Sequence, residues 1–407
     1  MSTSPSVFGR TLEAWRRETR AELGLPTDRA IIMTGHQAGI WHAGIAEKFR
    51  VGAELARTQQ GVLVHVVVDH DLNDASLVHF PALIEQTVGT PTLLRLALER
   101  TPRPRASVPN TLRQPVRTMR PERRHEVPAE IEPALHAIEV AIEAERHRAN
   151  LALQMAHAAN ALLAPSVRVD GTIAATEIAS TTFAKALRNA FETAGVREHY
   201  NASIEGQRIA PLAPHELPFW KLDRATSTRE PLYSNAAYEL VAPRALALTA
   251  IARLVLCDTF IHGTGGARYD EAMEHWIGSA FGAELCAALA PRIVATATRH
   301  APLSGFAAPF DDSATPLALR TLEQDPFADA GKTKRALLAT ITGTRAEKRV
   351  AFVAMHDAMR RAREERAEEF ASLRARIGQN SAARRTHALI TDRTWPFPLT
   401  MISPSSA

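Results

Sequence analysis

The sequence predicts an α/β fold: a doubly wound, mostly parallel sheet with an appendage of long, coiled-coil-like helices. Three observations lead to this expectation. Residues 31–74 read in unbroken order as a strand, a glycine-containing loop, a helix, a second strand and an acidic turn. Residues 254–270 again read as a strand that runs through a glycine-rich turn into a helix. Long helical patterns occupy residues 128–164 and 345–377.

The first unit starts with the apolar run at residues 31–33, which Thr34 and Gly35 interrupt. Residues 43–57 then follow a helical period, with Ile45, Phe49 and Ala53 on one face. Residues 62–68 are a continuous β-branched run, typical of a strand covered by helices on both sides. The pattern indicates a Rossmann-like parallel unit, in which residues 34–44 and 69–74 should face one crevice at the carboxyl ends of the strands.

The loop of this unit suggests how an anion would be bound. Unpaired amides at the start of a helix, together with the helix dipole, favour phosphate or carboxylate. An imidazole at this position can donate to oxygens that gain charge during nucleotidyl transfer. We therefore expect His42 to be catalytic and the rest of the loop to bind nucleotide or substrate through Thr34, Gly35, His36, Gln37, Gly39, Gly44 and Lys48. The alternative is that the two histidines cap and line a structural turn.

The acidic turn supplies groups for binding an amine and for proton transfer. Asp69, His70 and Asp71 follow the second strand directly, and an unperturbed imidazole titrates near pH ~6.5. We expect these three residues to be catalytic and Asn73 to contact substrate. A metal hydrolase that also uses His65 is a weaker alternative, because Asp69 and Asp71 share one strand face and His70 opposes them. No metal is therefore predicted.

The second glycine-rich turn, at residues 261–266, should reach the same edge of the sheet. Its glycines fall short of a complete dinucleotide fingerprint. They are assigned together with the start of the following helix to nucleotide or substrate contact, through His262, Thr264, Gly265, Gly266, Arg268 and Asp270.

These segments resemble a known family. Thr34-Gly35-His36-Gln37 with Gly39, the Asp69-His70-Asp71 turn, and residues 243–282 are similar to three blocks of the bacillithiol-synthesis cysteine-adding enzymes. His42-Ala43-Gly44-Ile45 also resembles the His-x-Gly-His tetrad of class I nucleotidyltransferases, without its second histidine. The resemblance implies a ligase that uses ATP or ADP, an amino acid such as cysteine and an anionic acceptor. It also implies a coiled-coil arm that forms a homodimer.

Composition narrows the class of protein. The 407-residue chain is 45% hydrophobic and 23% charged, as is usual for a folded globular protein. It contains neither a signal-peptide core nor an apolar run of membrane-spanning length, and its two cysteines lack metal or redox spacing, so a cytoplasmic protein with no membrane partner is expected. Only six of its 48 basic residues are lysines, and aromatic residues are not interleaved with the arginines, so no nucleic acid is expected.

The sequence predicts the following segments along the chain: an N-terminal helix (1–30), the first half of the core (31–127), a long helix (128–164), the second half of the core (165–300) with a hairpin or lid near 207–233, a loop-rich connector (301–343), a coiled-coil-like helix (344–380), and a C-terminal strand and tail (381–407). The two long helices form either a projecting arm or a cover for the core.

Two functions follow from these patterns. The first is a ligase or nucleotidyltransferase-like enzyme that joins an amino acid or a thiol to an acceptor in a nucleotide-binding crevice. The second is a non-catalytic nucleotide-binding protein whose long helices bind a partner. The missing second histidine of the tetrad favours the second function, and the two glycine turns with the acidic turn favour the first.

Overall fold

The computed structural model describes residues 4–84, 92–99, 107–117, 120–121, 125–164, 166–193, 195–327, 329 and 331–401. The chain divides into two compact units. The first comprises residues 1–80, 96–302 and 392–407, and the second comprises residues 81–95 and 303–391. Every site residue predicted from the sequence belongs to the first unit.

A five-stranded parallel sheet lies at the centre of the first unit. Its order is β13 (Arg292–Val294), β12 (Thr259–His262), β3 (Ile31–Gln37), β4 (Val62–Val68) and β8 (Gly171–Ala174). From β3 the chain adds β4 and β8 on one side, and it then returns to add β12 and β13 on the other. The strand order therefore reverses between β3 and β12, which is where open α/β sheets bind their ligands.

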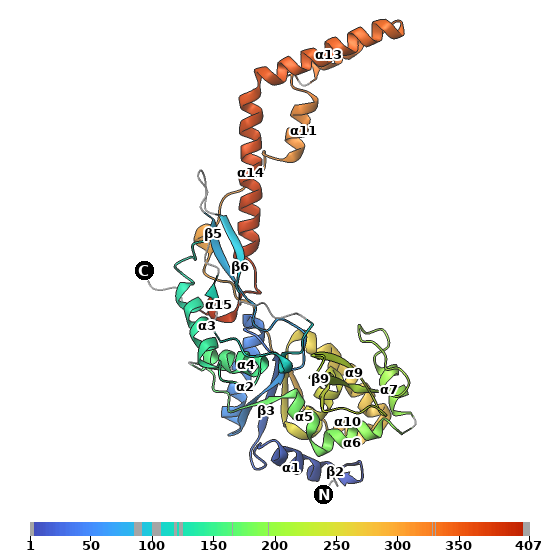
Figure 1. Cartoon of the computed structure of the whole chain (residues 1–407). Helices are drawn as coiled ribbons and strands as arrows, with labels where there is room; N and C mark the ends of the chain where they lie inside the picture. The colour runs from blue at the N-terminus through green and yellow to red at the C-terminus, as the bar shows by residue number, and fades with distance from the viewer. Residues whose placement is uncertain are drawn as a thin grey trace. The chain divides into compact units, whose positions relative to one another are not determined.

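Helices cover both faces of this sheet (Figure 1). Ile32, Leu63 and Ile261 face α2 (Ala43–Thr58) and α4 (Leu151–Leu163). Ile31 and Met33 point to the opposite side and pack in a larger core. That core includes residues of α1 (Leu12–Glu22), α5 (Ala175–Ser180), α6 (Thr182–Ala190), α8 (Ala245–Ile251), a π-helix (Ala252–Leu256) and α9 (Thr264–Phe281). Burial on both faces explains why β4 is almost continuously apolar.

The first unit also contains a separate three-stranded sheet. β9 (Glu216–Asp223) pairs antiparallel with both β10 (Thr228–Tyr233) and β11 (Leu240–Pro243). The remaining elements of this region are β1 (Ser6–Val7), β2 (Arg10–Thr11), η1 (Asn110–Leu112), β7 (Arg120–Pro121), α3 (Glu132–Ala144), α7 (Val196–Ser203), α10 (Ala283–Ala287) and α15 (Phe397–Thr400). The β9–β10 hairpin lies within the predicted hairpin segment at 207–233.

The second unit is mostly helical. It contains η3 (Ser304–Phe306), α11 (Pro316–Gln324), α12 (Lys332–Ala339), α13 (Arg345–Glu365) and α14 (Ala367–Ile390). The segment at 301–343 therefore carries helices where the sequence predicts mainly loops. α11 packs against α14, as Figure 1 shows, and α12 packs against α13. The apolar seam predicted along 345–377 is thus partly buried inside this unit, at Met355, Met359 and Phe370.

Several boundaries differ from the sequence-based expectation. The 128–164 segment forms two helices, because Asn150 begins a new one by accepting a hydrogen bond from the Leu153 amide at 2.9 Å. Likewise the 345–377 helix is broken at Arg366 and its second part continues to Ile390, through residues predicted to form a C-terminal strand. A hydrophobic period alone does not reveal these breaks.

Some strands also begin or end at other residues than the sequence predicts. β3 continues through Thr34 and Gly35 to Gln37, in register with all of β4. β5 (Val78–Ile84) accommodates Pro81 at the edge of a sheet with β6 (Thr92–Glu99) and β7. β12 begins only at Thr259, and not at residue 254, because the preceding residues are helical.

The Pro- and Arg-rich segment at 103–124 is described at residues 107–117 and 120–121, where it carries η1 and β7. Within the described part of the chain, no helix combines the length and apolar character needed to cross a bilayer.

Candidate functional site

A cavity of about 670 Å³ opens at the carboxyl ends of the central strands in the first unit. The ends of β3, β4 and β12 contribute Gln37, Val68 and His262 to its wall. α2 and the start of α9 supply further lining residues, and the β9–β10 hairpin covers another side. The cavity therefore lies at the reversal of strand order, where the sequence predicts the crevice.

Lys48 is the most unusual side chain of this cavity. The second turn of α2 brings it there, with only 3% of its surface exposed. Its Nζ donates to the Gly35 carbonyl oxygen at 2.6 Å, and among the described residues no carboxylate lies within ion-pairing distance of it. Burial lowers the pKa of Lys48 to about 7. A buried amine with this environment is typical of a functional site.

The two histidines of the first loop lie near this amine and are uncharged at neutral pH. His42 is the N-cap of α2, where its Nδ1 accepts from the Gly44 amide at 3.1 Å, so its Nε2 carries the proton. Burial, Arg393 and Lys48 all lower the pKa of His42. Burial and the Lys48 charge lower the pKa of His36 to about 3. These residues line the cavity together with Gly35, Gln37 and Gly44.

The second glycine turn meets the first across the cavity. Thr264, Gly265 and Gly266 open α9, and the first amides bonded within this helix are those of Gly266 and Ala267, which donate to the Gly263 carbonyl oxygen. The amides of Thr264 and Gly265 precede them at the positive end of the helix dipole. This arrangement is suited to an anionic group.

His262 lies beside this turn with a charged network behind it. Its Nε2 is 2.8 Å from Oδ2 of Asp270, which is buried. Asp270 also accepts from Arg253 Nη1 at 2.9 Å, and the same nitrogen donates to Glu274 at 2.6 Å. A Cβ on Gly266 would lie 2.6 Å from Nδ1 of His262, so the close approach of helix and imidazole requires glycine. Asp270 thus lies against His262 and does not itself line the cavity.

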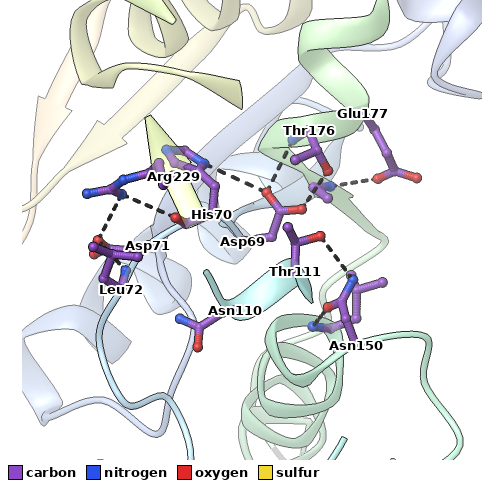
Figure 2. A network of polar contacts seen from close by, with 12 residues as sticks. Asp69, His70, Asp71, Leu72, Asn110, Thr111, Asn150, Thr176, Glu177 and Arg229 are labelled. Atoms are coloured by element: carbon purple, nitrogen blue, oxygen red, sulfur yellow. Dashed lines mark hydrogen bonds and ion pairs between the residues drawn. The ribbon is translucent and has the colours of Figure 1, made fainter. Parts of the chain in front are cut away.

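The Asp69-His70-Asp71 turn divides its side chains between two directions (Figure 2). Asp69 is fully buried and accepts from the Thr176 amide at 3.2 Å and the Thr176 hydroxyl at 2.5 Å, which fixes the start of α5. His70 and Asp71 line the cavity. Asp71 Oδ1 accepts from its neighbour Leu72 at 2.8 Å and from Arg229 Nη1 at 3.3 Å.

The structure thus removes several predicted residues from the cavity wall. Asp69, assigned a catalytic role from the sequence, anchors a helix because its side chain points to α5. Thr34 lies inside the sheet and donates to the Ile261 carbonyl oxygen at 3.0 Å. Asn73 bridges two loops through Ala38 and Asn110. Gly39 and Arg268 also lie outside the lining, as does Asp270.

His65 does not join the acidic turn in a metal site. It is fully buried on the α2 side of the sheet, where its Nδ1 lies 3.0 Å from Asn160 Oδ1 and its ring packs against Trp41 and Phe49. Burial lowers its pKa to about 3. Among the described residues, no group of three or more His, Cys, Asp or Glu side chains is placed to hold a metal ion.

The sequence did not reveal the arginines of the cavity. Arg229 on β10 and Arg244 after β11 both lie over the Trp220 ring, at 4.6 and 4.1 Å from its centroid, and all three residues line the cavity with Arg208. These positions are scattered over 37 residues of a chain rich in arginine, so spacing alone gave no signal. Only the hairpin or lid predicted near 207–233 pointed to this wall.

The comparisons with known proteins give no assignment. No protein-family model matches the chain, and no curated protein matches it either.

Proposed function

We propose that this chain is an enzyme that binds a nucleotide such as ATP or ADP in the cavity and joins an amino acid or a thiol to an anionic acceptor there. The proposal includes a Rossmann-like identity for the parallel sheet and an activity similar to that of the cysteine-adding ligases of bacillithiol synthesis. It rests on one observation: a large cavity at the reversal of strand order whose lining contains more cationic than anionic side chains.

The charges of the lining support an anionic ligand. Lys48, Arg208, Arg229 and Arg244 contribute cationic groups, whereas Asp71 is the carboxylate among the lining residues. The start of α9 adds amides at the positive end of a helix dipole. A phosphate chain would therefore be received by Lys48 and the first turn of α9, within reach of His42 Nε2 as a donor.

The same lining contains groups for moving a proton. An attacking amine must lose a proton before it forms an amide bond, and a group that titrates near neutral pH is suited to accept it. Lys48, whose burial lowers its pKa to about 7, lies in the wall, as do the imidazoles of His70 and His262. In this proposal they replace Asp69, which is engaged with Thr176.

Calorimetric titration tests the proposal. Wild-type protein is titrated with ATP, ADP and cysteine, alongside Lys48→Met and the exposed control Lys185→Met. Loss of a charged hydrogen-bond donor should weaken nucleotide binding about 10- to 100-fold in Lys48→Met. The control should bind like wild type. If wild-type protein binds neither nucleotide, the proposal is wrong.

A second candidate is a nucleotide-binding protein without catalysis. It is favoured by the engagement of two predicted catalytic side chains in structural contacts, Asp69 with α5 and His42 with the Gly44 amide. Nucleotide binding without turnover of any amino acid, in the presence of small amine or carboxylate acceptors, would select this candidate.

A further inference from the structure

We infer that Arg229, Arg244 and Trp220 form a carboxylate-binding subsite on the hairpin wall of the cavity. This inference rests on the proposed function and names the chemistry of one of its substrates: a small compound that presents a carboxylate group. The subsite is distinct from the start of α9, which supplies backbone amides.

The first argument is the shape of the subsite. Two planar guanidinium groups lie over a single indole ring, 4.6 and 4.1 Å from its centroid. Cation–π contact holds them at the ring. The indole therefore already has two partners, which leaves it as a support for the arginines in place of a surface for stacking a base.

The second argument is that hydrogen bonds to protein oxygens already hold each arginine in place. Arg229 Nη1 donates to the His70 carbonyl oxygen at 3.2 Å and to Asp71 Oδ1 at 3.3 Å (Figure 2). Arg244 Nη2 donates to Glu216 Oε1. The side chains are only 18% and 12% exposed, so both groups are ordered before any ligand arrives. Such preorganisation lowers the entropy lost on binding.

The third argument is an unsatisfied donor. Arg244 Nε is buried and has no hydrogen-bond partner among the described residues. A buried N–H without an acceptor carries a desolvation penalty, which a ligand oxygen would relieve. The bonds that hold Arg229 in place use only its Nη1, which leaves the rest of its fork for a second oxygen.

The ligand chemistry follows from this geometry. A carboxylate is planar and carries two oxygens, which match the paired N–H groups of a guanidinium. Arg208 lines the same cavity and adds a further positive charge, while Asp71 and Glu216 balance the two stacked arginines. A net positive subsite of fixed planar donors thus favours a carboxylate, and the amides of α9 remain for phosphate.

The experiment uses succinate as the carboxylate probe and ATP as the phosphate probe, each titrated calorimetrically and by tryptophan fluorescence at constant ionic strength. The variants are Arg229→Gln, Arg244→Lys and Trp220→Phe. Arg224→Gln, on the exposed turn of the same hairpin, is the matched control. Thermal melts establish that each variant is folded.

Succinate should change the emission of wild-type protein, and Trp220→Phe should abolish that change. Arg229→Gln should weaken succinate binding by at least about tenfold and ATP binding by less than about twofold. Arg244→Lys should do the same although it keeps the charge, because lysine lacks the fork. The control should leave both affinities unchanged.

Other results would overturn the inference. Wild-type protein that binds ATP but not succinate would exclude a carboxylate subsite and leave the proposed function standing. Equal losses of succinate and ATP affinity in Arg229→Gln would mean that the arginines bind phosphate. Binding of succinate without ATP would instead contradict the proposed nucleotide, and keep the subsite. If Arg229→Gln unfolds, wild-type affinity in Arg244→Lys alone refutes the geometric argument.

Discussion

Replacing Lys48 by methionine should stabilise the first unit while it weakens ligand binding. Methionine has a similar length and no charge, so it fills the same space without a buried ammonium group. The pKa of Lys48 falls from 10.5 to about 7 on folding. At ~1.36 kcal/mol per pKa unit, this difference makes the charged form cost about 4–5 kcal/mol of folding free energy.

The pH dependence has a definite sign. Between pH 7 and pH 10.5 the unfolded chain keeps the Lys48 proton and the folded chain releases it, so this residue makes wild-type stability rise with pH. Below about pH 7 the full cost is present. The advantage of Lys48→Met should therefore be largest at pH 6 and should shrink towards pH 10.

Tryptophan fluorescence is the appropriate assay, because Trp15, Trp41, Trp220, Trp276 and Trp395 all lie in the first unit. Urea unfolding at pH 6, 8 and 10 gives the free energy of unfolding as a function of pH for wild type, Lys48→Met and the exposed control Lys185→Met. The control should stay within ~0.5 kcal/mol of wild type. A Lys48→Met protein that is less stable at pH 6, by an amount that does not vary with pH, would refute the reasoning.

Three further predictions concern separate parts of the chain. Asp69→Ala should destabilise the first unit by about 2–4 kcal/mol in urea unfolding, since it leaves the Thr176 amide and hydroxyl without their acceptor; a change below ~0.5 kcal/mol would show that Asp69 does not anchor α5. Gly266→Ala should displace the His262 ring, because the new Cβ would lie 2.6 Å from Nδ1; nitrogen chemical shifts of His262 report this, and unchanged shifts would contradict it. Val350, Phe352 and Val353 on α13 are 71%, 51% and 51% exposed, so the homodimer that the family resemblance implies should be lost in Phe352→Asp; light scattering measures the mass, and a wild-type monomer would exclude the dimer.

The sequence predicted the α/β class and the location of the crevice because both depend on local patterns. The strand β4 is apolar at every position except His65 and glycines mark two turns at strand ends, so the parallel arrangement follows from residues near one another in the chain. The sequence indicates Lys48 as a binding residue only through its position near the start of α2. Its burial without an acidic partner became visible only in three dimensions.

The rest depends on contacts between distant segments. The side chain of Asp69 turns away from the cavity because Thr176, 107 residues later, offers two donors. Arg229 reaches Asp71 across 158 residues, and no local pattern distinguishes it from the other arginines. The helix break at Asn150 is different, since a capping residue stood in the sequence but the regular apolar spacing on both sides concealed it.

The order of strands in the parallel sheet has a consequence for how this chain emerges during synthesis. The neighbour of β3 on one side, β12, is made late: Thr34 bonds to Ile261, 227 residues further along. Until then the central strand of the finished sheet is an edge strand with unpaired backbone groups, a known template for aggregation. Shortened versions that end before residue 259 would expose this edge permanently. Truncation boundaries for expression therefore need to fall beyond β13. Because incomplete chains on the ribosome expose the same edge, we expect them to bind chaperones.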